Sequence, residues 1–433
     1  MDQRGLVNPC SPEPAEDATW LSGDAAAELL GVRRETLYAY ASRGLVRREP
    51  IRGRRAMRYL REDLERLRAR SSARSGHGPV AAGALRWGEP ILETSISSIE
   101  PAGPRYRTHL AVDLVARKAR AEAVMALLWE APTASEPATA RLEVAFVKRL
   151  VAMGSPAMRP IDGLALALPA LSLRDDLRHD ASREAEIERA RKIIAELGAL
   201  LALPHGAARV SDATKEAGLA RIALRAFGRE PKRRAVAAVD AALVLLADHE
   251  LNASAFASRV AAGTGADLYA CFTAALAVAS GPRHGGAADR VEALAAEVIA
   301  CASSRKSNDW GATAREVVFT RAQRGDAIPG FGHNLYPGGD PRAPPLLCAA
   351  RGVSAAAPGV RAVDALIAAM AQRKQLPTVD CGLVALSFAL GLPPGAAAGL
   401  FVLGRTAGWV AHVFEQRAQG FLLRPRARYV GPR

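Results

Sequence analysis

Long alanine-rich runs are the feature that most limits what this chain can fold into. A representative run, AVDALIAAMAQRKQ, extends from Ala362 to Gln375, and only 5% of the residues are aromatic although 49% are hydrophobic. Alanine is the best helix former and a poor strand former. The sequence therefore predicts an all-α protein. A length of 433 residues allows a sizeable core and about two or three domains.

The remaining composition indicates a soluble protein of the cytoplasm. The five cysteines form no close pairs, so neither a disulfide framework nor a zinc site is expected. The first 17 residues are acidic and proline-rich, where a signal peptide would need an apolar run. The apolar stretches after Asp267 and around Arg405 fall short of the roughly 20 clean residues of a spanning helix. We therefore expect a cytoplasmic location and no membrane contact.

Positive charge is concentrated near the N-terminus. Residues 20–78 contain 14 arginines, no lysine and 7 acidic residues, which accounts for about half of the net charge of +14. Nucleic-acid binding is one explanation. The other is a base composition that favours Ala and Arg, so charge alone does not choose between them.

The pattern inside this segment predicts a helix-turn-helix. Ser22 is placed to cap a helix that ends at Gly31, and a second helix, RRETLYAYASR, is closed by Gly44. A basic hairpin turning near Gly53 and a helix from about Arg61 follow. The second helix of such a unit enters the major groove of DNA, which makes these residues of that helix the DNA-binding candidates: Arg33, Arg34, Thr36 and Tyr40.

This segment resembles the small winged DNA-binding domains of MerR-type regulators and excisionases over about 50 residues. The resemblance implies DNA as a partner. The same fold also serves as a docking or dimerisation module, and that alternative stays open.

A segment of small and polar residues predicts the boundary between two domains. Residues 71–84 are small, polar and Gly-rich, as in a linker. We expect a disordered N-terminus at 1–17, a winged helix-turn-helix domain at 18–70 and a second, larger unit at 85–433. In that unit, SISSIE and RYRTHL favour a small β element before helices that begin near Asp113. No Gly-rich phosphate loop is present, so nucleotide hydrolysis is not indicated.

Acids, bases and anion-binding groups accumulate in the last third of the chain. Two histidines and a carboxylate can deprotonate a carbon acid and protonate a carbonyl, and guanidiniums can hold a dianion. The candidate residues are His284, His333 and Asp380, with Arg342, Arg405 and Arg424 between and after them. The other histidines carry no such signal: His77, His205 and His412 are expected to be structural, and His109 and His179 are neutral to the argument.

Six motifs around these residues occur in the order found in the citrate synthase family. They are DHELNAS, SGPRHGGA, PGFGHNLYPGGDPRA, VDCGLVALSFALGLP, GRTAGWVAHVFEQ and RPRARYVG, all between Asp248 and Gly431. With the ETSIS segment at Glu93, the similarity covers roughly 340 residues. The chain thus resembles this family, which implies a large and a small helical domain, the small one at approximately 287–393.

The resemblance also implies a role for each candidate residue. Asp380 would remove a proton from the methyl group of an acyl-CoA, His284 would stabilise the enol, and His333 would protonate the ketone of the oxo acid. The oxo acid would be held by His249, Arg342, Arg405 and Arg424. The last arginine comes from the partner subunit in this family, so a homodimer is implied.

The PGFGH loop is expected to contact coenzyme A through Gly330, Phe331 and Gly332. The following NLYPGG segment lacks the basic residue with which many relatives meet the coenzyme phosphates. Thr378 replaces a common Asn, and Cys-Gly follows Asp380 in place of aromatic residues. No metal and no bound cofactor are expected, because the CoA thioester is a substrate.

Three functions are compatible with this pattern. The first is citrate synthase, which condenses acetyl-CoA with oxaloacetate and water. The second is 2-methylcitrate synthase, whose acyl group is larger by one methyl, a difference worth only about 1–3 kcal/mol of discrimination. The third is a DNA-binding regulator whose synthase-like domain senses acyl-CoA or oxo acid without turnover. Retention of the catalytic residues argues against a pure sensor.

Overall fold

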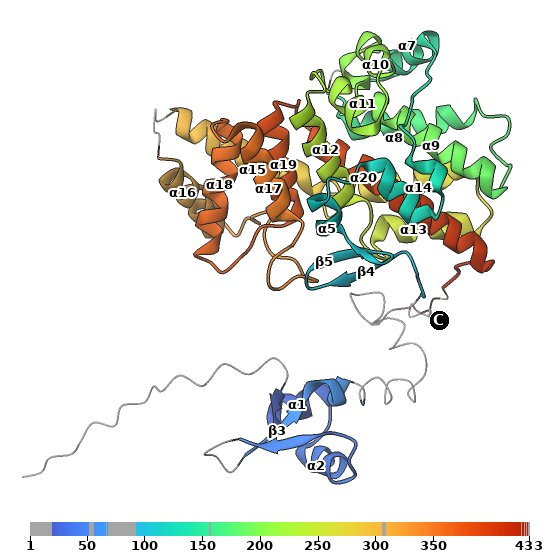
Figure 1. Ribbon diagram of the computed structural model, residues 1–433. Helices are drawn as coiled ribbons and strands as arrows, with labels where there is room; N and C mark the ends of the chain where they lie inside the picture. Colours follow the sequence, from blue (N-terminus) through green and yellow to red (C-terminus); the bar gives the residue numbers. More distant parts are fainter. Residues whose placement is uncertain are drawn as a thin grey trace, which may run out of the picture. The chain divides into compact units, whose positions relative to one another are not determined.

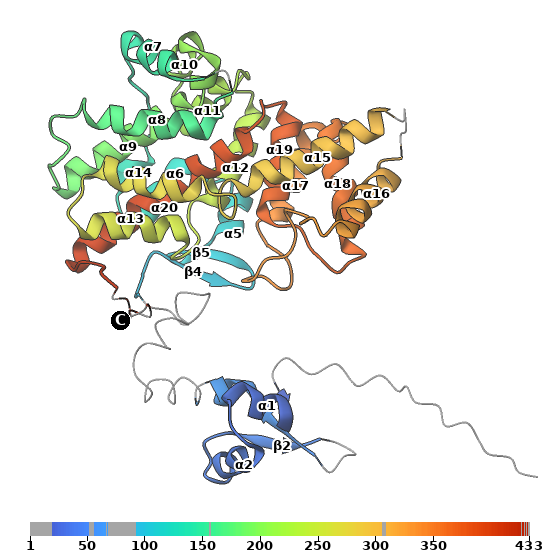
Figure 2. The ribbon, with the colours of Figure 1, turned by 180° about the vertical axis from the view of Figure 1, so that it is seen from behind.

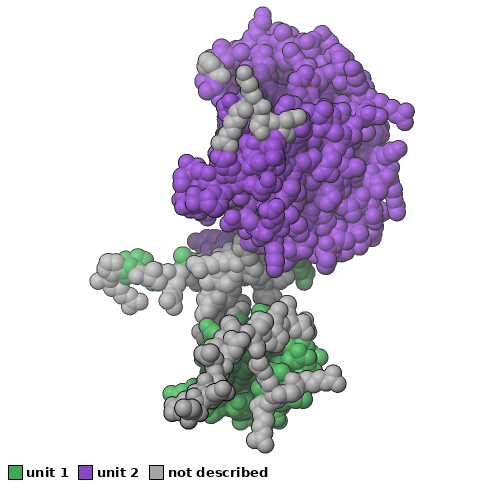
Figure 3. All heavy atoms as spheres, turned by 90° about the vertical axis from the view of Figure 1, so that its left-hand side faces the viewer, with its two compact units in different colours: residues 1–93, 426–433 green, residues 94–425 purple. Residues whose placement is uncertain are grey.

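The computed structural model describes residues 20–51, 56–65, 67, 92–155, 157–304, 309–425, 427, 429 and 431. The chain divides into two compact units, residues 1–93 with 426–433 and residues 94–425, which Figure 3 shows in two colours. The predicted disordered N-terminus and the linker, including His77, lie outside the described residues.

The N-terminal unit is a helix-turn-helix with a small sheet. Its elements are β1 (Trp20–Ser22), α1 (Gly23–Leu30), α2 (Arg34–Ser42), β2 (Arg48–Pro50) and β3 (Met57–Leu60). The strands pair antiparallel in the order β1-β3-β2. Ser22 Oγ accepts a hydrogen bond from Ala25 N at 3.3 Å, and Gly31 ends α1 with a left-handed φ of 62°. The predicted cap and stop of this helix are therefore confirmed.

The predicted wing of this unit is the β2–β3 hairpin, whose tip at 52–55, including Gly53, lies outside the described residues. The chain is helical again over residues 61–65. Arg47, directly before β2, is hydrogen-bonded to Asp63 of this helix. Its backbone N and its Nε donate to Asp63 Oδ2 at 2.9 and 2.8 Å. Leu37 and Leu64 are fully buried and form the centre of a small core with Tyr59.

The larger unit starts with the small β element that the sequence predicts. Three antiparallel strands form it in the order β4 (Ser97–Glu100), β5 (Gly103–Tyr106) and β6 (His109–Leu110). Helices then follow almost without interruption, which confirms the predicted all-α class. The first group is α5 (Ala111–Ala116), α6 (Ala121–Trp129), η1 (Pro132–Ser135), α7 (Val144–Met153), α8 (Pro160–Ser172), α9 (Arg183–Leu200), η2 (Leu203–His205), α10 (Ala207–Ala213), α11 (Leu219–Ala226), α12 (Arg233–Leu246), α13 (Ala253–Gly263) and α14 (Leu268–Ala279).

A second group of helices packs together at one side of this unit (Figure 1). It consists of α15 (Ala287–Ser304), α16 (Trp310–Gln323), α17 (Ala343–Ser354), α18 (Pro358–Ala371) and α19 (Val379–Leu390). The view from behind shows the same grouping (Figure 2). The group spans nearly the same residues as the expected small domain at 287–393, whose existence as a separately moving domain stays a prediction.

The last helix, α20 (Ala396–Gln419), runs through the core of the unit and packs against helices of both groups. Its glycines permit this, since a Cβ on Gly404 would lie 2.8 Å from the Leu246 Cβ. By length and composition, α20 is the one helix of the described residues that could cross a membrane, but its apolar window is entirely buried inside the protein. The helix therefore serves as the central core element around which the candidate site is built.

Candidate active site

Three aromatic side chains form one wall of the candidate site. His249 follows α12, and His333 and Tyr336 lie in the loop between α16 and α17. His249 Nε2 is 3.1 Å from the Tyr336 hydroxyl. The His333 ring centre lies 5.6 Å from that of His249 and 4.9 Å from that of Tyr336. The fold thus brings together two histidines that are 84 positions apart in the numbering.

The hydrogen bonds of His333 decide which ring nitrogen carries its proton. Leu335 N donates to His333 Nδ1 at 3.1 Å. A backbone N–H can only donate, so Nδ1 is the acceptor and a neutral ring is protonated on Nε2. Burial and the charge of Arg342 lower the pKa of His333, which keeps it neutral at pH 7. Its Nε2–H can therefore act as a proton donor to a substrate oxygen.

Two buried arginines provide positive charge beside this wall. Arg342 is 3% exposed, and its Nε and Nη2 lie 2.9 and 2.8 Å from the two oxygens of Asp340. Arg405 is 1% exposed, and its Nε donates to Leu246 O at 2.7 Å. Their charges, after burial itself, help to lower the pKa of His249 well below its usual value. A small dianion is the ligand that two such guanidiniums favour.

Asp380 lies in the first turn of α19, next to the arginine pair. Asp340 Oδ2 accepts from Val379 N at 2.9 Å, which joins the two segments. Thr378 Oγ1 donates to Asp380 Oδ2 at 2.9 Å. Burial raises the pKa of Asp380, with the Thr378 hydrogen bond and the Arg342 charge opposing the rise. A carboxylate with a raised pKa is a better base than an exposed one.

A short antiparallel contact holds the PGFGH loop against the residues before Asp380. Phe331 pairs with Pro377, Gly332 N donates to Leu376 O at 2.9 Å, and Thr378 N donates to Gly330 O at 2.8 Å. Gly330 has a φ of 89°, and a Cβ there would lie 2.7 Å from Cys381 Sγ. The loop that carries His333 and the helix that carries Asp380 are therefore fixed to each other.

His284 lies between α14 and α15, against α20. Its Nε2 is 2.8 Å from Ser254 Oγ, and Trp409 Nε1 donates to the same oxygen at 3.0 Å. Burial, followed by the charge of Arg405, lowers the pKa of His284 to about 4. The ring is therefore neutral at pH 7 and can donate one hydrogen bond and accept another.

Comparison with known proteins shows which family the chain belongs to. The family described as "Citrate synthase, C-terminal domain" matches residues 84–426, and a helix-turn-helix domain family matches residues 20–72. This chain belongs to the citrate synthase family. Within the family, citrate synthase of Haloferax volcanii is 30% identical over 363 residues, which cover 79% of this chain and 93% of that protein.

Other members of the citrate synthase family match with different coverage. A Mycobacterium tuberculosis protein provisionally named citrate synthase 2 is 39% identical over 210 residues, 47% of this chain, and the match spans only about half (53%) of that relative. A 2-methylcitrate synthase of the same species is 30% identical over 372 residues, 79% of this chain and 89% of that protein. The structure of a ternary complex of Thermoplasma acidophilum citrate synthase shares the fold, with a TM-score of 0.64, 24% identity and coverage of 79% and 94%.

The structure brings most of the predicted site residues together and leaves one apart. His249, His333 and Arg342 are linked through Tyr336, and both His284 and Arg405 pack against Phe401. The first turn of α19, which carries Asp380, is joined to the Asp340–Arg342 pair through Val379 N. Arg424, in contrast, is exposed in the segment that follows α20. Its supply by a partner subunit, as in the citrate synthase family, stays a prediction, and so do the roles of all these residues.

Sequence reasoning missed several residues that complete the citrate synthase-like site. Tyr336 stands between His333 and Arg342 in the same loop, so its position was a usable signal. Ser254 and Trp409 were not recognisable, because Trp409 is connected to His284 only through Ser254, by a hydrogen bond between segments 155 residues apart. Within the described residues, no group of three or more His, Cys, Asp or Glu side chains could hold a metal ion.

The DNA-binding candidates of the N-terminal unit are not equivalent. Arg33, just before α2, and Arg34 are exposed, although Arg34 forms an ion pair with Asp24. Thr36 is half-buried, and Tyr40 packs against the small core. Tyr38, which was not among the candidates, is 48% exposed on the same helix. Arg33, Arg34 and Tyr38 are therefore exposed at or near the start of α2, and DNA binding by the four candidates stays a prediction.

Proposed function

We propose that the protein is a citrate synthase, which condenses acetyl-CoA and oxaloacetate with water to give citrate and free CoA. The observation that carries this proposal is the placement of Asp380, His284 and His333 beside two buried arginines. In the Thermoplasma acidophilum structure, citrate synthase holds carboxymethyl coenzyme A and oxaloacetate together. Oxaloacetate is a dianion of the size that Arg342 and Arg405 suit.

The proposed reaction assigns one chemical step to each of the three groups. Asp380 removes a proton from the methyl carbon of acetyl-CoA, and His284 donates a hydrogen bond to the thioester oxygen as the enol forms. The enol carbon attacks the ketone carbon of oxaloacetate, and the Nε2–H of His333 protonates the ketone oxygen to an alcohol. Water then cleaves the thioester to citrate and CoA thiol.

The hydrogen bonds of Ser254 define the state in which His284 can donate. Ser254 has one hydroxyl proton, which it donates to Asn252 Oδ1 at 2.8 Å, and His284 Nε2 lies 2.8 Å from the same Ser254 oxygen, so His284 donates from Nδ1 only after that proton turns away from Asn252. When that proton points to Nε2, a neutral His284 carries its own proton on Nδ1, which is free for the thioester oxygen. Ser254→Ala should therefore lower kcat more than it raises the KM for either substrate.

Release of CoA thiol tests the proposal directly. Purified protein is assayed with acetyl-CoA or propionyl-CoA, with and without oxaloacetate, and Asp380→Asn is the control. Release with acetyl-CoA that requires oxaloacetate and Asp380 supports the synthase. An Asp380→Asn variant with unchanged turnover would overturn the mechanism, and no release with either thioester would favour the sensor function.

A second candidate is 2-methylcitrate synthase, favoured by the similarity to the 2-methylcitrate synthase of Mycobacterium tuberculosis. Propionyl-CoA differs by one methyl group, so the ratio of kcat/KM for the two thioesters decides between the activities. A ratio in favour of propionyl-CoA would replace the first assignment.

We also propose that the enzyme works as a homodimer, in which each subunit supplies Arg424 to the site of its partner. The exposure of Arg424 in the single chain supports this arrangement. Mixing inactive Asp380→Asn with inactive Arg424→Ala subunits should restore part of the activity, because one site of the mixed dimer receives both intact residues. Mixed subunits that stay inactive, although sedimentation shows that they exchange, would contradict it.

The N-terminal unit is proposed to bind DNA through α2 and the hairpin. Its helix-turn-helix fold and exposed arginines support this function. Salt-sensitive retardation of genomic DNA fragments by the full chain is the test. Equal DNA affinity with and without oxaloacetate would argue against coupling between DNA binding and the synthase site.

A further inference from the structure

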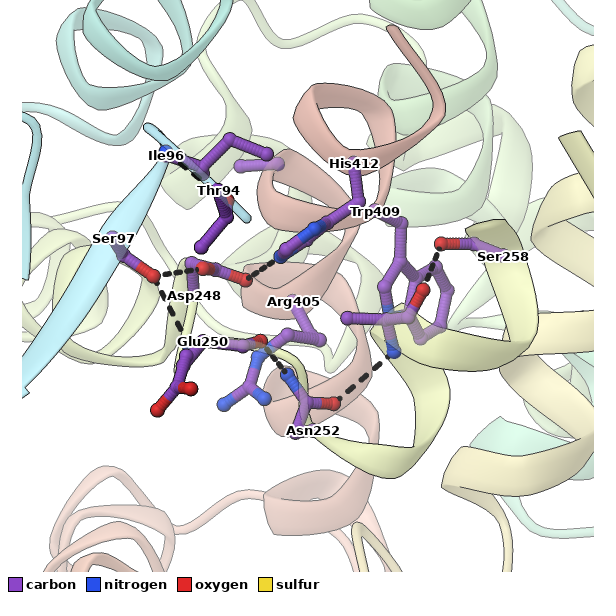
Figure 4. A network of polar contacts seen from close by, with 12 residues as sticks. Thr94, Ile96, Ser97, Asp248, Glu250, Asn252, Ser258, Arg405, Trp409 and His412 are labelled. Atoms are coloured by element: carbon purple, nitrogen blue, oxygen red, sulfur yellow. Dashed lines mark hydrogen bonds and ion pairs between the residues drawn. The ribbon is translucent and has the colours of Figure 1, made fainter. Parts of the chain in front are cut away.

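One face of α20 contacts the last residue of α12 and the segment that follows it at three successive points. Arg405 Nε donates to Leu246 O at 2.7 Å, and Gly408 N donates to Ala247 O at 2.9 Å. One turn further, His412 Nε2 is 3.4 Å from Asp248 Oδ1. The contacts advance along the helix and along the segment in step, and Figure 4 shows Arg405, Asp248 and His412 of this row. Asp248 directly precedes His249, so the row ends beside the aromatic wall of the site.

Asp248 is also fixed from the opposite side. Ser97 Oγ, on β4, forms a hydrogen bond to Asp248 Oδ2 and accepts one from Glu250 N at 3.0 Å (Figure 4). The Tyr106 hydroxyl, on β5, donates to the carbonyl oxygen of Val244 at 2.9 Å. The small sheet and α20 therefore hold the segment between them.

The contact between α20 and this segment leaves no room for adjustment. A Cβ on Gly408 would lie 2.5 Å from Ala247 O and closer still to Asp248 Oδ1. The side chains of both Asp248 and His412 are 0% exposed. Taking a carboxylate out of water is strongly unfavourable unless it is paired, so this pair constrains how the two elements fit together.

The Asp248–His412 pair lies close in sequence to Arg405 and His249, two residues that are proposed to bind the oxo acid. Arg405 precedes His412 by seven residues, two turns on the same face of α20, and His249 is the neighbour of Asp248. The terminal nitrogens of Arg405 have no hydrogen bond to another described residue, so the Nε contact, the packing on Phe401 and the position on α20 orient the guanidinium. A shift of α20 along the segment would separate Arg405 from His249.

We infer that Asp248 and His412 are positioning residues for the oxo acid, which hold α20 in register with residues 246–249 so that Arg405 and His249 face one ligand. This inference rests on the proposed function, because oxaloacetate is taken as that ligand. Neither residue touches the substrate. Their loss is expected to weaken oxo acid binding. His284 and Asp380, which are proposed to act on the acyl-CoA, should be affected less.

Calorimetric titration with oxaloacetate, without acyl-CoA, measures this effect independently of turnover. Asp248→Asn and His412→Phe are each expected to raise the Kd about tenfold, equivalent to ~1.4 kcal/mol. The KM for acetyl-CoA should change less than about twofold, since misplacement is confined to the oxo acid groups. The double variant removes the buried charge, so its stability should recover in part while the Kd stays high.

Glu122→Gln is the matched control. Glu122 is a buried carboxylate, 2% exposed, that accepts from Leu219 N at 2.7 Å on a different pair of helices. Its loss should lower the melting temperature without changing the Kd for oxaloacetate. If Asp248→Asn does not fold, Ser97→Ala is the milder variant, because it removes the hydrogen bond from Ser97 to Asp248 but not the Asp248 carboxylate.

The outcomes separate this inference from the proposed function. Wild-type protein that binds no oxaloacetate overturns both. Wild-type protein that binds it, with variants that bind equally well or lose oxaloacetate and acetyl-CoA affinity in equal measure, overturns the positioning role alone. A double variant that recovers both stability and Kd would reduce the pair to a structural one.

Discussion

The two units use arginine in opposite ways. In the larger unit, Arg342 and Arg405 are 3% and 1% exposed and are held by fixed hydrogen bonds. In the N-terminal unit, the side chain of Arg34 is 51% exposed and Arg33 is exposed as well. Buried guanidiniums in fixed positions suit a small ligand of defined geometry, whereas exposed ones suit a polyanion that is bound by releasing counterions. The same residue type is therefore placed in two different environments, which suit the two kinds of recognition proposed for this chain.

The strongest test of this contrast removes a buried arginine. Arg405→Met should lower kcat/KM for oxaloacetate by about a thousandfold, or ~4 kcal/mol, because a buried charge pair with the substrate is lost. Steady-state kinetics with saturating acetyl-CoA measures the change. Arg351→Met is the control, since Arg351 is exposed on α17 and pairs with Asp364. Nearly normal kinetics of the Arg405 variant would show that this arginine does not hold the oxo acid.

Removing the carboxylate that pairs with Arg342 tests how much this buried pair contributes to the stability of the protein. In Asp340→Asn, Arg342 loses a partner in a pair whose side chains are 4% and 0% exposed. Breaking a buried pair from one side lowers the free energy of unfolding by about 3–5 kcal/mol. Urea denaturation measures it. Asp364→Asn breaks the exposed Arg351 pair and should change stability by less than about 1 kcal/mol. Equal losses in the two variants would remove the distinction between buried and exposed pairs.

Burial also keeps His284 uncharged, so the stability of the larger unit is expected to depend on pH. The pKa of His284 is lowered to about 4 in the folded protein, below its value in the unfolded chain. The unfolded state therefore binds more protons between about pH 6.5 and pH 4, and stability should fall by about 2 kcal/mol as pH decreases through that window. His284→Gln should lose this part of the pH dependence in denaturation curves. An unchanged slope would mean that His284 is not shielded.

The smallest expected effect concerns the exposed arginines. A double Arg33→Ala, Arg34→Ala variant of the full chain should bind DNA more weakly and reduce the slope of log affinity against log salt by about 1–2. Fluorescence anisotropy at about 50–200 mM salt measures it. The KM for oxaloacetate should stay within about twofold over the same range, because buried pairs are screened less. Salt-independent DNA binding would contradict the assigned surface.

Local sequence patterns predicted the elements well where the cause is local. Ser22 and Gly31 delimit α1 because capping and left-handed termination depend on neighbouring residues. The candidate catalytic residues His284, His333 and Asp380 could also be proposed from the sequence, because each lies in a motif with its own glycines or prolines. Tyr336 could have been added from its place between His333 and Arg342.

Other parts of the site depend on contacts that no local pattern contains. His412 was expected to be structural, and it lies fully buried 3.4 Å from Asp248, a residue 164 positions earlier. Ser254 of α13 contacts His284, and Trp409 of α20 donates to the same Ser254 oxygen. These pairings arise only when α20 enters the core, because they join segments that are far apart in the chain.

The sequence by itself determined the helical class, the helix-turn-helix and the identity of the acids, bases and arginines, because these follow from residue type and short-range spacing. Only the tertiary structure decided which of these groups are neutral, which arginines are buried and which side chains hold them. Those properties come from desolvation and from hydrogen bonds between distant segments, and they exist only in the packed protein.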